Sequence, residues 1–100
     1  IVAGDFNNSI IWDKKGNDNN FNNINDHFVG LGFVSNYHKL KDEGFGKESY
    51  ATFFHTKKES KKYHIDYIYS KNLNPLELKV GSYTKWISYS DHSPLIAELG

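Results

Sequence analysis

The stretch that decides the fold is residues 63–70, which read Tyr-His-Ile-Asp-Tyr-Ile-Tyr-Ser. Its side chains alternate in character with a period of two, which is typical of a β-strand that is buried on one face. One face is expected to carry Ile65, Tyr67 and Tyr69, and the other His64, Asp66 and Ile68. The stretch therefore predicts a strand that places one carboxylate, that of Asp66, on the face opposite to the aromatic core.

The segments around this strand predict a small α+β fold of the α/β sandwich type. Apolar or β-branched runs predict further strands at Ile1–Phe6, Tyr50–Thr56 and Pro94–Leu99, with a shorter one at Leu76–Val80. We expect the strands at 1–6, 50–56, 63–70 and 94–99 to form one mostly antiparallel β-sheet. A helix should cover one face of this sheet.

The helix is predicted from a periodic apolar stripe. The stripe residues fall at i, i+3, i+7 and i+10, and are Phe21, Ile24, Phe28 and Leu31. Gly30 and Gly32 are placed to end the helix. The asparagine-rich run at 17–25, with six Asn in nine positions, leads into it and reads either as a solvated loop or as a disordered segment.

Composition limits the possible functions. One hundred residues allow one small domain, and 12 basic and 12 acidic residues give a formal net charge of zero. A nucleic-acid binder that acts alone usually carries a basic excess, so neutrality argues against tight, charge-driven DNA binding by this chain. Without cysteine there is neither a disulfide framework nor a thiolate metal site. No apolar stretch is long enough to cross a membrane. The sequence does not fix a compartment, although the cytoplasm is favoured.

Three short motifs place acidic side chains at the ends of predicted strands. They are Gly4-Asp5-Phe6-Asn7, the Asp66 strand, and Ser90-Asp91-His92-Ser93-Pro94. Hydrolysis of a phosphodiester needs an attacking water, a cation and donors for the phosphoryl oxygens. Carboxylates suit Mg²⁺ or Mn²⁺, and a histidine supplies a donor or base. If Asp66 binds the far nitrogen of His92, it fixes the orientation of that ring.

Each motif has a structural reading as well. Asp5 alone is typical of a turn that ends a strand, and Asp66 alone is typical of an exposed strand residue. The segment 90–94 alone is typical of a loop before a strand, with Pro94 marking the strand start. The three motifs in this order, each at a strand edge, favour a catalytic site.

In their order and flanking residues the three motifs resemble the endonuclease/exonuclease/phosphatase superfamily, which includes the DNase I-like and exonuclease III-like phosphodiesterases. The resemblance is to small bacterial members and covers essentially residues 1–100. It implies a metal-dependent hydrolase that cleaves phosphodiesters by in-line attack of an activated water, with nuclease activity on DNA or RNA expected. The cofactor implied is Mg²⁺ or Mn²⁺.

The resemblance also implies roles for particular residues. Asp5 would orient or deprotonate the attacking water, and Asn7 would help to stabilise the transition state. Asp91, together with Asp5, would belong to the metal site. His92 would contact the scissile phosphate, with Asp66 as its hydrogen-bonded partner. Substrate-binding positions would be Phe53, Phe54 and His64, although many nucleases of the family have arginine at the position of His64.

The same resemblance implies that the chain is the C-terminal half of a domain more than twice its length. In fold terms, it would form half of a four-layer sandwich. The metal-binding glutamate and further phosphate contacts would come from the N-terminal half. We therefore expect this chain alone to be inactive, and to associate with itself or with that half. The alternatives are a phospholipid or phosphoinositide phosphodiesterase or phosphatase of the same superfamily, and a non-catalytic binding module on the same scaffold.

Overall fold

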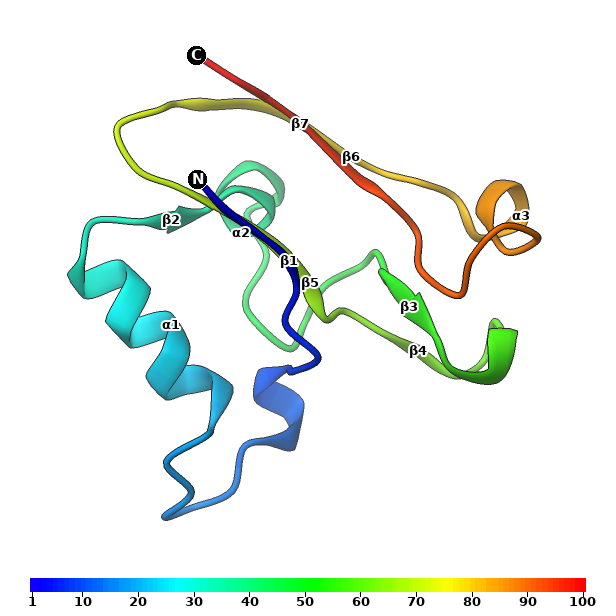
Figure 1. The fold of residues 1–100 in the computed structure, drawn as a ribbon, viewed down its shortest axis with the longest axis horizontal. Coiled ribbons are helices and arrows are strands. Elements are labelled where there is room, and N and C mark those ends of the chain that lie inside the picture. The colour runs from blue at the N-terminus through cyan, green and yellow to red at the C-terminus, as the bar shows by residue number, and fades with distance from the viewer.

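A three-stranded antiparallel sheet lies at the centre of the protein (Figure 1). The computed structural model describes all 100 residues, Ile1–Gly100. Strand β5 (Asp66–Ser70) is the middle strand, with β1 (Val2–Asp5) on one side and β2 (Val34–Ser35) on the other. In the pairing of β1 with β5, Val2 lies opposite Tyr69 and Asp5 lies opposite Asp66. The register therefore brings two of the predicted site residues together at one end of the sheet.

The fold is α+β with antiparallel strand pairing, as expected, but its strands form three small sheets and not one. Strand β3 (Phe53–Phe54) pairs with β4 (Lys62–Tyr63), and β6 (Pro75–Val80) pairs with β7 (Leu95–Leu99). The stretch 63–70 is thus interrupted between β4 and β5. The reason is that the hydroxyl oxygen of Thr52 accepts the backbone N–H groups of Ile65 and Asp66, at 3.0 and 3.2 Å.

The helices are short and connect the strands. They are α1 (Phe21–Gly30), α2 (Asn36–Lys41) and α3 (Tyr83–Trp86), with single 3₁₀ turns η1 (Ile10–Trp12) and η2 (His55–Lys57). The expected strand at 50–56 is therefore reduced to two residues followed by a 3₁₀ turn. None of the helices has the length and apolar character needed to cross a bilayer.

The core is aromatic and lies between α1 and the central sheet. Phe21, Tyr67 and Tyr69 are at most 1% exposed, and Phe21 stacks on Tyr67 with ring centroids 4.7 Å apart. Burial raises the pKa of Tyr67, so this phenol stays protonated and donates toward the carbonyls of Asn8 and His64, each 3.0 Å away. Aromatic residues fill this core because rings bury a large area with few rotatable bonds.

Helix α1 ends as the two glycines predicted. Leu31 is the C-cap, and Gly32 follows with φ +91°, in the left-handed region that favours glycine. The Gly32 N–H donates to the carbonyl of Val29 at 3.0 Å, and the Phe33 N–H to that of Phe28 at 3.0 Å. This pair of bonds is the Schellman arrangement, which satisfies carbonyls that the helix leaves free.

The start of α1 is capped by a side chain from outside the helix. The carboxylate of Asp13 accepts the N–H groups of Phe21 and Asn22, at 2.7 and 3.0 Å. We expect Asp13→Ala to cost about 1 kcal/mol, because it leaves helix N–H groups unpaired and removes an anion from the helix N-terminus. That loss corresponds to a thermal midpoint about 4–8 °C lower, measured by circular dichroism at one protein concentration.

Asp18→Ala is the control for this cap, since only the backbone carbonyl of Asp18 is engaged nearby, by the Asn23 amide at 3.4 Å. It should leave the thermal midpoint nearly unchanged. Equal losses in the two variants would mean that general charge, and not the Asp13 hydrogen bonds, stabilises α1.

Candidate active site

Two carboxylates face each other at the end of the central sheet. Asp5 and Asp66 are register partners on antiparallel strands, and directly opposite like charges destabilise such a pair. The side chain of Asp5 is 47% exposed and that of Asp66 is 16% exposed. A cationic or hydrogen-bond-donating group between them offsets the repulsion, and His92 occupies that place.

The backbone around His92 is fixed by the segment that precedes and includes β3. His92 forms an antiparallel bridge with Phe53, the Phe54 N–H donates to the Asp91 carbonyl at 2.8 Å, and the Ser93 N–H donates to the Thr52 carbonyl at 2.9 Å. The hydroxyl oxygen of Ser90 accepts the His92 N–H at 3.0 Å. The loop at 90–94 is therefore held like a short strand against 52–54, which gives His92 a defined position.

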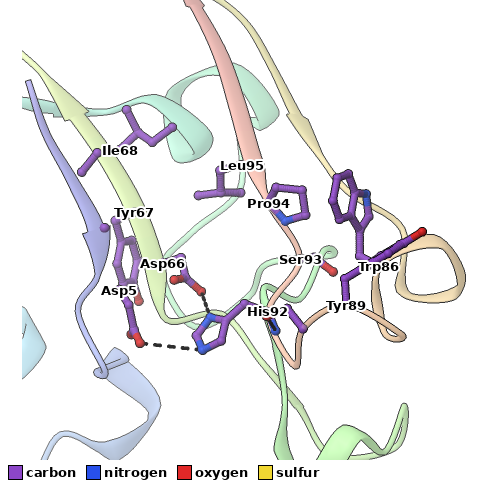
Figure 2. A pocket seen from close by; sticks show the side chains of 13 residues that line it. Asp5, Asp66, Tyr67, Ile68, Trp86, Tyr89, His92, Ser93, Pro94 and Leu95 are labelled. Carbon is purple, nitrogen blue, oxygen red and sulfur yellow. Dashed lines mark hydrogen bonds and ion pairs between the residues drawn. The ribbon is translucent and has the colours of Figure 1, made fainter.

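The imidazole of His92 lies among three carboxylates, and Figure 2 shows two of them, Asp5 and Asp66. Its Nδ1 is 2.9 Å from Oδ2 of Asp66, a hydrogen bond in which the ring N–H donates. Its Nε2 is 3.7 Å from Oδ2 of Asp5 and 4.0 Å from Oδ1 of Asp91. Both distances are longer than a hydrogen bond, so Nε2 remains able to contact a further oxygen atom. Asp66 thus orients the ring, while Nε2 faces the two exposed carboxylates.

Asn7 is joined to the group through Asp5. Its backbone N–H donates to Oδ1 of Asp5 at 2.7 Å, and its φ of +52° is left-handed, a conformation that asparagine tolerates. Oδ1 of Asp5 is therefore occupied by the turn, while Oδ2 points toward His92.

The same side chains could hold a cation. One ligand atom each from Asp5, Asp66 and His92 lie within 4.8 Å of one another. Asp5 and Asp91 are each about half exposed, so a cation between them would keep water ligands, as Mg²⁺ prefers. Asp91 is not part of this group of three, and its carboxylate approaches it through Nε2 of His92, at 4.0 Å.

Thr52 is a positioning residue that the sequence analysis did not single out. It is fully buried, and its hydroxyl oxygen accepts the N–H of Asp66 while its carbonyl accepts the N–H of Ser93. It thereby connects the strand that carries Asp66 to the loop that carries His92. In the sequence, Thr52 is marked only by the two aromatic residues that follow it. A threonine before aromatic residues is common in strands and does not indicate a positioning role.

The three predicted substrate-binding residues lie in different places. Phe53 packs on His92 with ring centroids 4.9 Å apart, next to the site. Phe54 is 6% exposed and packs on Tyr83 instead, at 4.6 Å. Adjacent strand residues point to opposite faces, so these two rings do not line one surface.

His64 is also not brought to the group around His92. It is 5% exposed, and its ring packs on Tyr37 at 4.5 Å and on Tyr67 at 5.3 Å. The alternation of residues 63–70 placed it on the face of Asp66, but the interruption between β4 and β5 turns it into the interior. The structure therefore gives His64 an internal position and leaves its predicted contact with substrate without support.

A cavity of about 620 Å³ adjoins the carboxylate–histidine group. It lies between β1 and β5 on one side and the chain from α3 to β7 on the other (Figure 2). Asp5, Asp66 and His92 lie at one end. Its apolar wall is formed by Ala3, Ile68, Trp86, Tyr89, Pro94 and Leu95. A charged end and an apolar wall are the features of a ligand-sized site.

Comparison of the chain with protein-family models, with curated proteins and with solved structures gives no match. Any functional conclusion must therefore rest on the motifs and on the geometry described above.

Proposed function

We propose that this chain supplies the carboxylate–histidine part of the active site of a metal-dependent phosphodiesterase, with a nucleic acid as the expected substrate. The observation that carries the proposal is the arrangement of His92, whose Nδ1 is held by Asp66 while Nε2 faces Asp5 and Asp91. A binding module without chemistry has no physical need to hold three carboxylates around one histidine.

Each group has a role in this proposal. His92 would donate from Nε2 to a phosphoryl oxygen, with Asp66 stabilising the imidazolium and its orientation. Asp5 would accept a proton from the attacking water. A divalent cation held by Asp5 and Asp91 would neutralise the charge that develops on the phosphoryl group. Asn7 would help to stabilise the transition state, as the resemblance implies, and its backbone N–H holds Oδ1 of Asp5.

A phospholipid or phosphoinositide substrate is the second candidate. The apolar cavity beside His92 favours it, because a lipid substrate presents both a phosphodiester and apolar chains. The neutral net charge of the chain is compatible with either substrate class.

The test is hydrolysis of defined substrates in the presence and absence of chelator. Single-stranded DNA, duplex DNA, RNA and phospholipid vesicles are each offered to the 100-residue chain alone and to a longer protein that joins it to the N-terminal half that the resemblance implies. We expect Mg²⁺-dependent cleavage by the longer protein and at most weak cleavage by the chain. Asp5→Asn should lower the rate by about 10²-fold or more.

Asp18→Asn is the matched control, since it makes the same change at an exposed aspartate outside the site. It should leave the rate unchanged. Cleavage that survives both chelator and Asp5→Asn would refute the metal-dependent proposal, and the preferred substrate decides between the two candidates.

A further inference from the structure

A second cluster of ionisable side chains lies inside the protein and has no part in the proposed reaction. His38 comes from α2, Glu48 from the loop that follows it, and His64 from the link between β4 and β5. One ligand atom from each lies within 4.8 Å of the other two. The side chains of His38 and Glu48 are 7% and 5% exposed, and His64 is 5% exposed. Buried ionisable groups of this kind are rare unless they are paired or bind a metal.

His64 has one ring nitrogen occupied and the other unpartnered. Its Nδ1 is 2.9 Å from the carbonyl oxygen of Tyr50, and because a carbonyl can only accept, Nδ1 carries the hydrogen. Nε2 is buried and has no hydrogen-bond partner. Burial lowers the pKa of His64, so the neutral ring keeps a lone pair on Nε2. Buried ring nitrogens without a hydrogen-bond partner are uncommon, and a bound ion or water molecule is one explanation for them.

His38 is held in a similar way. Its Nδ1 is 2.6 Å from the hydroxyl oxygen of Ser35, and its Nε2 is 2.7 Å from Oε2 of Glu48. In both histidines an oxygen atom of the surrounding chain therefore fixes Nδ1, and Nε2 is the nitrogen on the side of the cluster. Histidines that bind metals are commonly oriented by an outer hydrogen bond of this kind.

Glu48 provides the negative charge of the cluster. Burial opposes its ionisation, but the hydrogen bond from His38 and the other polar contacts outweigh that effect and hold its pKa below the usual value. The Gly46 N–H also donates to Oε2, at 3.1 Å. The cluster therefore combines one carboxylate with two imidazoles, a nitrogen-rich donor set that differs from the carboxylate-rich group around His92.

A cavity gives access to the cluster. It has a volume of about 150 Å³, and both Glu48 and His64 line it. The exposed residues Ser49, Tyr50 and Lys62 also line it, so it opens to the surface. This volume is ample for an ion and a water molecule.

We propose that His38, Glu48 and His64 form a binding site for a divalent transition-metal ion of the zinc class, with a water from the cavity as a further ligand. Two imidazoles and one carboxylate are a known donor set for Zn²⁺, whereas Mg²⁺ prefers oxygen atoms alone. The ion replaces the proton that lies between His38 Nε2 and Glu48 Oε2. The ring exchanges that hydrogen through solvent for one on Nδ1, from which it donates to the hydroxyl oxygen of Ser35, so His38 stays neutral and no net proton is released.

The ion would join three segments of the chain, namely α2, the loop at 42–52 and the link between β4 and β5. Binding to the folded state alone raises stability by mass action. The competing interpretation is a closed hydrogen-bonded network that fixes the same loop without any metal. The two interpretations differ in whether the cluster has affinity for a metal ion.

The test is a Co²⁺ titration of the His92→Ala chain in excess Mg²⁺, followed by displacement with Zn²⁺. The substitution removes the imidazole of the proposed active site, and Mg²⁺ occupies oxygen-rich groups. We expect one equivalent of Co²⁺ to bind with the visible absorption bands of a nitrogen-ligated ion. Glu48→Gln and His64→Gln should each weaken binding by more than the 10–100-fold that loss of an outer hydrogen bond costs.

His27→Gln and His55→Gln are the matched controls, because both histidines are exposed and outside the cluster. They should retain full affinity. If Glu48→Gln or His64→Gln does not fold, the nitrogen resonances of the imidazoles decide the question in the unsubstituted chain. Zn²⁺ should then shift Nε2 of His38 and His64 and leave His27 and His55 unchanged.

Two results would overturn the proposal. One is the absence of saturable Co²⁺ or Zn²⁺ binding in excess Mg²⁺, which would leave the hydrogen-bonded network as the explanation. The other is that Glu48→Gln and His64→Gln bind the ion as tightly as the chain that retains Glu48 and His64. Neither result depends on phosphodiesterase activity, so this proposal and the proposed function can fail separately.

Discussion

Replacement of His92 by alanine is expected to lower phosphodiester hydrolysis by about 10²–10⁴-fold in kcat/KM. His92 is the one side chain whose ring connects Asp66, at 2.9 Å, with the exposed carboxylates of Asp5 and Asp91. Its loss removes the donor to the phosphoryl oxygen. It also leaves Asp5 and Asp66 opposite each other without the ring N–H that donates to Asp66.

A double-mutant cycle tests whether His92 and Asp66 act as one unit. Asp66→Asn alone should also lower kcat/KM, because the neutral amide no longer stabilises the imidazolium or fixes which ring nitrogen carries the hydrogen. The double variant should be no slower than His92→Ala, since Asp66 acts through the ring. Kinetics on the substrate that the unsubstituted protein cleaves best give all four values.

Asp26→Asn, an exposed aspartate on α1, serves as the control for loss of charge and should retain full activity. Additive losses in the cycle would show that Asp66 and His92 act independently and would remove the basis of the proposed arrangement. The assay uses the same longer protein as the test of the proposed function.

Much of the fold could be predicted because its signals are local. The period of residues 63–70 identified the strand and its buried aromatic face, and Tyr67 and Tyr69 are indeed in the core. The apolar stripe and Gly30 and Gly32 identified α1 and its end. In each case the residues that determine the element lie within it or directly beside it, as Leu31 and Gly32 lie just after α1.

The interruption at residues 64–65 could not be predicted, because it depends on a distant side chain. The Thr52 hydroxyl accepts N–H groups that a continuous strand would pair with a neighbour, and it lies 13 residues before Ile65. The burial of His64 follows from this bend. The division into three sheets also follows from such distant contacts.

Part of the candidate site could be predicted because its residues lie at the ends of strands that have local signals. Asp5, Asp66, Asp91 and His92 were proposed from three strand ends, and the structure brings them together at one edge. The sequence predicts that Phe53 and Phe54 both bind substrate, but neighbouring residues of a strand point to opposite faces, so only Phe53 lies beside His92. The cluster of His38, Glu48 and His64 carries no local pattern, so only the packing of α2 against β5 could show it.

The isolated 100-residue chain is expected to self-associate, because one face of its central sheet is left partly uncovered: a cavity of about 620 Å³ separates β1 and β5 from the chain between α3 and β7. Helix α1 and the aromatic core cover the other face. On the partly uncovered face Ala3 and Ile68 form part of the apolar wall of this cavity, and the neighbouring Ile1 is 69% exposed. The protein is a slab of 38 × 38 × 20 Å in which 15 residues are buried. So small a core leaves little stability in reserve.

The free energy gained by self-association depends on the apolar area that it covers. Apolar surface contributes about 25 cal/mol per Å² when it is removed from water, so covering a few hundred Å² provides several kcal/mol. That amount is comparable with the whole stability of a small domain. An exposed apolar patch of this size is also a usual site of association. A second copy of the chain would cover the same face.

Sedimentation velocity over a range of concentrations gives the measurement. We expect the unsubstituted chain to form dimers or larger species, and Ile68→Lys to shift the population to monomer because it puts a charge on the partly uncovered face. Val29→Lys is the matched control, since Val29 is 56% exposed on α1, and it should leave the association unchanged. An unsubstituted chain that stays monomeric and unfolds cooperatively would refute this prediction. Such a chain would not need a second layer on its central sheet.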